Sequence, residues 1–240
     1  MRHNSTMNDI KIDAHEHMNN ARRALIEGNE HEALTELNKA TTLYKKVYEH
    51  EPSLLAEYYG KLASILSLKL EKYKDSARYA RASAEKYLEA GDAINAAYAY
   101  YTLGEIYDID LDSLKGAADA FNKAAELYLE QDKNSLNAAE CFDKLASIYY
   151  RAGEYDIVCG ALKKCTTIKY NVNGNATSTA LAMHNAGKMC FDMRMLDEAT
   201  AYMTRALDIY VSLEGENGEN SVSVREELKM VKAYKGYELI

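Results

Sequence analysis

Residues 103–124 read LGEIYDIDLDSLKGAADAFNKA, and this stretch decides the fold. The spacings of Leu103, Gly104 and Tyr107 place all three on one face of a helix. After a short break, a small, a bulky and a small residue follow at helical spacing, and they are Ala117, Phe121 and Ala124. Because small side chains let two helices approach closely, the stretch predicts a helical hairpin.

The small residue that opens the second half of this pattern returns at intervals of 40 to 44 residues. It stands at Ala33, Ala77, Ala117, Val158 and Ala199. Such a period is typical of stacked supersecondary units, each of which covers the apolar face of its neighbour. We therefore expect an all-α, right-handed α-solenoid of about five hairpins, closed by an amphipathic capping helix over residues 222–239.

The composition agrees with an all-helical chain. Its 240 residues include one proline, Pro52, and proline is the residue that most strongly interrupts helices. We expect a disordered tail over residues 1–7 and a single helical-repeat domain over residues 8–240. The net charge of −8 argues against a general nucleic-acid binder, which needs a cationic surface.

Several function classes lack their sequence signals. Residues 1–7 have no apolar signal-peptide core, and no segment reaches the roughly 18 apolar residues of a membrane span, so we expect a cytoplasmic protein. The four cysteines form no CxxC pair and are predicted to be buried, reduced thiols. His15 and His17 point to different helix faces, which makes a poor metal pair. We predict no catalytic, cofactor or metal site, and no enzyme.

Three turn residues carry specific predictions. Gly153 follows an apolar helical pattern and is predicted to end that helix in a left-handed conformation. Ser53 and Ser221 follow polar breaks and are predicted to cap the helices that start there.

The alternation of Leu-Gly-x-x-Tyr with Ala-x-x-x-Phe-x-x-Ala resembles the tetratricopeptide repeat, with a longer period. In tetratricopeptide arrays the first helix of each hairpin lines a concave groove, so the resemblance implies a groove for a peptide or helix of a partner. The groove candidates are Tyr98, Tyr101, Glu105, Asp143, Tyr150, Arg151, His184, Lys188 and Phe191. Tyrosine and arginine suit such a role, but each tyrosine can equally be a packing residue.

A second resemblance is more specific. The segments that resemble the soluble NSF attachment proteins, called SNAPs, are residues 87–92, 104–108, 117–121, 124–128 and 136–141. This resemblance covers residues 70–170 and includes the connection before Ala117. It implies a non-enzymatic adaptor that attaches SNARE complexes to the hexameric NSF-type ATPase in vesicle fusion and intracellular protein transport.

The SNAP resemblance also implies where partners would bind. A SNARE bundle is acidic, so the adaptor needs positive charge, and the candidates are Lys74, Arg78, Arg81, Lys163 and Lys164. A solvated helix face explains the same residues. SNAPs have an acidic, leucine-bearing carboxyl end that stimulates the ATPase. Leu239 beside Glu238 is the candidate for that role here, and chance explains the same two residues. Residues 27–32 are polar where SNAPs carry an apolar membrane loop, so we expect membrane contact to be at most peripheral.

Two alternatives stay open. Residues 197–210 resemble kinesin light chain repeats, which favours a general tetratricopeptide scaffold that binds a peptide or helix of another partner. A regulatory protein that changes shape around a peptide signal is the third possibility, and it would need an effector domain that the sequence does not display.

Overall fold

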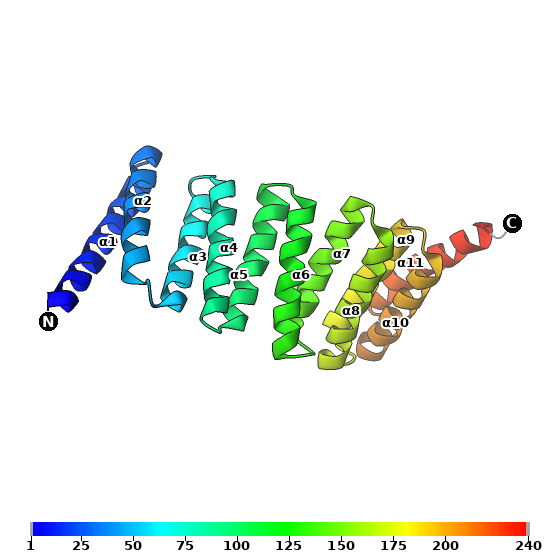
Figure 1. Ribbon diagram of the computed structural model, residues 1–240. Coiled ribbons are helices and arrows are strands. Elements are labelled where there is room, and N and C mark those ends of the chain that lie inside the picture. The colour runs from blue at the N-terminus through cyan, green and yellow to red at the C-terminus, as the bar shows by residue number, and fades with distance from the viewer. Residues whose placement is uncertain (1, 239–240) are drawn as a thin grey trace. The chain divides into compact units, whose positions relative to one another are not determined.

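A computed structural model describes residues 2–238, and over that range the chain forms eleven α-helices, one short π-helix and no strand (Figure 1). The elements up to residue 131 are α1 (Arg2–Ile26), α2 (Glu30–Val47), α3 (Pro52–Leu68), α4 (Tyr73–Glu89), α5 (Ala93–Glu105), the π-helix η1 (Ile106–Asp110) and α6 (Leu114–Gln131). The remaining helices are α7 (Leu136–Ala152), α8 (Tyr155–Asn173), α9 (Thr177–Asp192), α10 (Leu196–Glu214) and α11 (Glu219–Glu238).

The contacts divide the chain into two compact units, Met1–Leu127 and Tyr128–Ile240. Within them, helices that follow one another in the sequence pack as hairpins, α1 with α2, α3 with α4, α7 with α8 and α9 with α10. The predicted all-α solenoid of helical hairpins is confirmed. Helix α1 begins at Arg2, inside the segment for which we expected a disordered tail. The single domain over residues 8–240 stays a prediction.

The first unit packs small residues where its helices approach most closely. Ala14 on α1 and Ala40 on α2 are completely buried. Tyr44 of α2 and Tyr58 of α3 carry this core into the next hairpin, with ring centroids 4.3 Å apart. Leu62 of α3 is 2% exposed, and burial of one such side chain stabilises the fold by about 1.5–3 kcal/mol.

The stretch that predicted the fold forms the third hairpin. A Cβ atom at Gly104 of α5 would lie 2.8 Å from the ring of Phe121 on α6, so only glycine fits there. The ring of Tyr101 meets the same Phe121 edge-on, with centroids 5.2 Å apart. Between the two helices, the connection includes the π-helix η1, which continues directly from α5.

The second unit repeats this packing with somewhat larger residues. Gly153 ends α7 at φ 76° and ψ 12°, which confirms the predicted left-handed cap. Gly187 of α9 lies against Met203 of α10, where a Cβ atom would be 2.6 Å from the Met203 Cγ. Helix α11 packs on α10 and buries one stripe, Val224, Leu228 and Val231. This confirms the predicted capping helix.

Both serine N-cap predictions are wrong. Helix α3 starts one residue before Ser53, because Pro52 occupies its first turn and Glu51 takes the cap position. Ser221 is buried inside α11, and its backbone N–H donates to the Oε1 of Glu214 at 2.7 Å. The acceptor at the start of α11 is therefore the carboxylate of Glu214, which ends α10, and not the hydroxyl of Ser221.

Candidate protein-binding surfaces

Helices α3 and α5, the first helices of their hairpins, border two adjoining hollows with volumes of about 260 and 330 Å3. Both hollows are lined by Ala63, Ser64 and Thr102, so they form one surface, which we call the α3/α5 groove. The whole groove lies within the first unit. Residues of the second helix α4 also contribute to the lining, and they are Ser76, Ala80, Ser83 and Tyr87.

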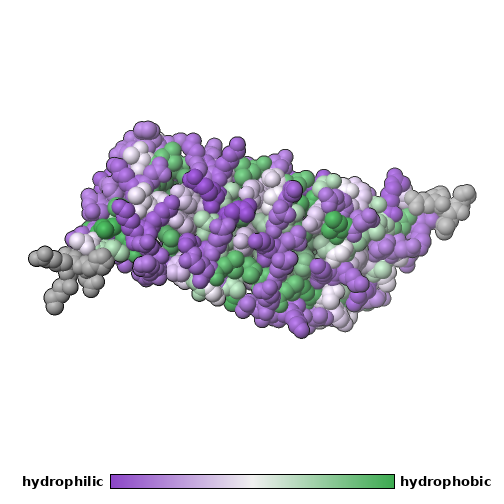
Figure 2. All heavy atoms as spheres, in the orientation of Figure 1, coloured by the Kyte–Doolittle hydropathy of each residue, from purple (hydrophilic) through white to green (hydrophobic). Residues whose placement is uncertain are grey.

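Apolar side chains stand exposed along this groove. Tyr98 lines the first hollow and is 64% exposed, while Leu68 and Ile109 line the second and are 78% and 71% exposed. Side chains of this size are costly to leave in water. On the face that Figure 2 shows, apolar side chains lie among polar ones along the surface.

The charged side chains that line the groove are mostly acidic. Glu57 pairs with Lys61 one turn along α3. In the second hollow, the hydroxyl of Ser67 donates to the Oδ2 of Asp110 at 2.7 Å, and Glu105 lines the same hollow. The groove therefore carries three carboxylates against one ammonium group.

The π-helix η1 shapes the end of the groove. Its wider turn places Ile106, Ile109 and Asp110 on the lining of one hollow, together with Leu68 from α3. Sequence reasoning named Tyr98 and Glu105 as groove residues, and both line it. It missed Leu68, Ile109 and Asp110. The signal for Leu68 and Ile109 was an apolar residue at a position that the repeat pattern leaves outside the core, and Asp110 had no signal of its own.

The basic candidates of α4 lie elsewhere. Lys74 is exposed. Arg78 pairs with Asp75 at 3.1 Å, and its guanidinium lies 4.8 Å from the ring centroid of Tyr79. Arg81 donates to the Tyr107 hydroxyl at 3.2 Å, which raises the pKa of the guanidinium.

Arg81 does not face the α3/α5 groove. It lines a different hollow, between α4 and α6, together with Lys123. The structure thus places Arg78 and Arg81 on the second helix of the hairpin, each oriented by a neighbouring side chain. We call Lys74, Arg78 and Arg81 the α4 basic ridge.

The other predicted residues lie in the second unit or outside the described chain. Lys163 and Lys164 are exposed on α8, and the Lys164 ammonium is 4.8 Å from the ring centroid of Phe142. A basic stripe that joins them to the α4 basic ridge stays a prediction. Arg151 and Lys188 are exposed, and the rings of Tyr150 and Tyr155 have centroids 5.8 Å apart. Leu239 lies outside the described residues.

Two of the second unit's groove candidates instead hold the capping helix. His184 of α9 bonds Glu227 of α11 through Nε2 at 2.8 Å. Phe191 of α9 meets the ring of Tyr234 edge-on, with centroids 5.9 Å apart. Sequence reasoning had assigned both to a partner surface.

The buried cysteine thiols are poorly suited to act as nucleophiles. Cys141, Cys165 and Cys190 are buried, and burial raises the pKa of their thiols to about 12, 11 and 12. A thiol that keeps its proton is a weak nucleophile and a weak metal ligand. Among residues 2–238, no cluster of three His, Cys, Asp or Glu side chains could hold a metal ion, and no helix is long and apolar enough to cross a bilayer.

Comparison with solved structures decides the fold. RapI gives a TM-score of 0.61 at 14% identity, covering 95% of this chain and 72% of that one. Kinesin light chain TPR-like repeats from P. anserina give 0.58 at 12% identity, over 82% and 95% of the two chains. The chain has a tetratricopeptide-like helical-repeat fold. BtubC (BKLC) from P. vanneervenii shares it, with a TM-score of 0.55 at 17% identity over 90% and 94% of the chains.

The match to a sequence family covers a shorter part of the chain than the structural matches do. The soluble NSF attachment protein (SNAP) family matches residues 64–167, which run from the end of α3 into α8. This is less than half of the tetratricopeptide-like chain. No curated protein matches it significantly.

Proposed function

We propose that the chain is a non-enzymatic, SNAP-like adaptor that attaches SNARE complexes to the NSF-type ATPase in vesicle fusion and intracellular protein transport. The observation that carries this proposal is the SNAP family match over residues 64–167, which spans consecutive helices rather than one repeat. In this account the adaptor performs no chemistry. It works in the cytoplasm and touches membranes at most peripherally.

The α4 basic ridge supports the SNARE part of the proposal. The matched segment contains the ridge, and its side chains are exposed. Asp75 and Tyr107 hold Arg78 and Arg81 in defined positions, so less side-chain freedom is lost when an acidic partner binds. Complementary charge of this kind speeds association and fixes orientation.

Binding to an assembled SNARE bundle tests the proposal. The full chain is passed over immobilised bundle at low and at physiological salt, and the NSF-type ATPase is then added. Retention of the chain followed by capture of the ATPase supports the adaptor role. Absence of retention at both salts, with a folded and helical protein, refutes it.

A general protein-binding scaffold is the second candidate function. The α3/α5 groove favours it, because exposed apolar side chains line a concave surface that is separate from the α4 basic ridge. Such a scaffold would bind a peptide or helix of a partner other than a SNARE bundle.

A further inference from the structure

We propose that the α3/α5 groove binds a cationic amphipathic helix of a partner protein, with two apolar side chains about seven residues apart and lysine or arginine beside them. The inference rests on the second candidate function, the protein-binding scaffold. It names the chemistry of the partner that such a scaffold would take.

The two hollows set the spacing of the apolar side chains. On the α3 side, Lys61 lines only the first hollow and Leu68 only the second, seven residues later. At about 1.5 Å per residue, this separation is about 10 Å along the helix axis. Residues i and i+7 of a partner helix lie on one face at the same separation, so one apolar side chain can enter each hollow.

The lining of the hollows fits apolar anchors. Tyr98 offers a largely exposed ring at the first hollow, and Leu68 and Ile109 offer aliphatic surface at the second. These three side chains lose most of their contact with water when a helix covers them. Their burial supplies the apolar part of the binding free energy.

The charge of the groove selects the partner. Glu57, Glu105 and Asp110 face it, and Lys61 is paired with Glu57. The resulting negative potential attracts lysine and arginine at the edges of a bound helix and repels an acidic segment. An acidic SNARE bundle therefore fits the α4 basic ridge and not this groove, which keeps the two proposals separable.

Synthetic helical peptides test the proposal with the full chain. The first probe carries leucine at positions i and i+7 flanked by lysines, the second replaces the lysines with glutamates, and the third replaces the leucines with alanines. Fluorescence anisotropy of labelled peptides gives the affinities. The first probe should bind about tenfold or more tightly than either of the others. Equal binding of the lysine and glutamate peptides would overturn the proposal.

Two pairs of variants locate the binding. Ile109→Ser should weaken the first peptide about tenfold, whereas Ile94→Ser, at an exposed isoleucine of α5 outside both hollows, should leave the affinity unchanged. Equal effects of the two serine variants would refute the groove as the site. Glu105→Gln with Asp110→Asn should weaken the lysine peptide, and Glu126→Gln with Glu130→Gln on α6 is the control with the same charge change. Circular dichroism confirms that each variant is folded.

The outcomes separate the two functions. Loss of peptide binding in the groove variants with SNARE retention intact would support both surfaces. SNARE retention without any preference for the lysine peptide would refute the groove proposal alone. Lysine-peptide binding without SNARE retention would refute the SNAP-like proposal alone.

Discussion

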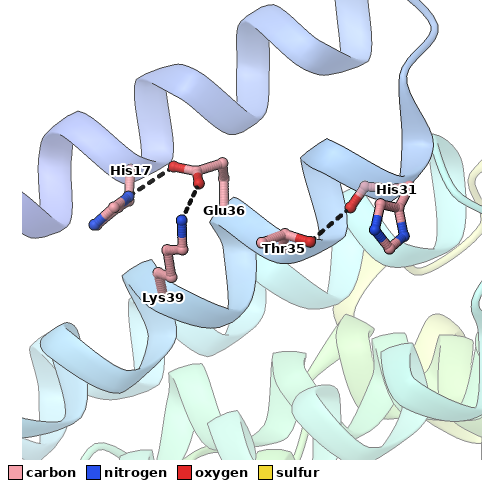
Figure 3. A network of polar contacts seen from close by, with 5 residues as sticks. All are labelled: His17, His31, Thr35, Glu36 and Lys39. Atoms are coloured by element: carbon pink, nitrogen blue, oxygen red, sulfur yellow. Dashed lines mark hydrogen bonds and ion pairs between the residues drawn. The ribbon is translucent and has the colours of Figure 1, made fainter.

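His17 on α1 donates from Nδ1 to the Oε2 of Glu36 on α2 at 2.6 Å (Figure 3). Lys39, one turn further along α2, donates to the other carboxylate oxygen at 2.7 Å. Glu36 is 8% exposed, so its charge is held almost out of water by these two donors. The hydrogen bonds from Lys39 and His17 lower the pKa of the Glu36 carboxyl from 4.5 to about 2.

This pairing predicts how the first hairpin responds to acid. Because the pKa of Glu36 is depressed in the folded chain, its contribution to stability is complete above about pH 4.5 and is lost as the pH falls toward 2. Glu36→Gln should lower the free energy of unfolding at pH 7 by about 1–2 kcal/mol and should cost little at pH 2. Urea unfolding at both pH values measures this. Glu16→Gln, at an exposed glutamate of α1, is the control.

A smaller loss for Glu36→Gln at pH 7 than at pH 2 would contradict the assignment. An equal loss for the two glutamine variants at pH 7 would do the same.

The close approach of α9 and α10 gives a second prediction. Gly187→Ala places a Cβ atom against the Met203 side chain and 3.3 Å from the backbone oxygen of Ala199, so we expect a destabilisation of about 1–3 kcal/mol. Gly160→Ala, on the exposed face of α8 with no atom near the new Cβ, should instead stabilise the chain by up to about 1 kcal/mol. Chemical denaturation compares the two. If both variants shift the denaturation midpoint in the same direction, the register of α9 against α10 is wrong.

Helix packing also explains which features of the fold could be predicted from the sequence and which could not. The period of small residues such as Ala117 and Ala199 predicted the hairpins, because close helix approach leaves few residue choices. The π-helix η1 has no such signature, since its wider turn depends on contacts of Ile106 and Tyr107 with the following loop. Placement of Tyr98 in a groove followed from what the tetratricopeptide resemblance implies. The exposure of Ile109 there did not, because it depends on η1.

The capping helix supplies a third prediction. Leu228 of α11 is 5% exposed within the buried stripe, so Leu228→Ala should lower the free energy of unfolding by about 2–4 kcal/mol. Met230, two residues later, is 60% exposed, and Met230→Ala should change it by less than about 0.5 kcal/mol. Thermal unfolding followed by circular dichroism distinguishes them. An unshifted midpoint for Leu228→Ala would mean that α11 does not close the array.

The α4 basic ridge supplies a fourth prediction. Arg78→Glu with Arg81→Glu reverses two charges at exposed positions, so we expect binding to an acidic SNARE bundle to weaken about tenfold or more at low salt, with less effect at high salt. Lys45→Glu with Lys46→Glu makes the same charge change on the exposed face of α2 and serves as the control. Titration at two salt concentrations measures both. Equal weakening by the two double variants would assign the effect to net charge and not to the ridge.

ATP-dependent disassembly of a labelled SNARE bundle by the NSF-type ATPase tests the central claim most directly. The SNAP-like account predicts that adding the full chain accelerates disassembly, and that Arg78→Glu with Arg81→Glu removes the acceleration. Disassembly at the rate of the ATPase alone, with a folded chain at saturating concentration, would contradict the account.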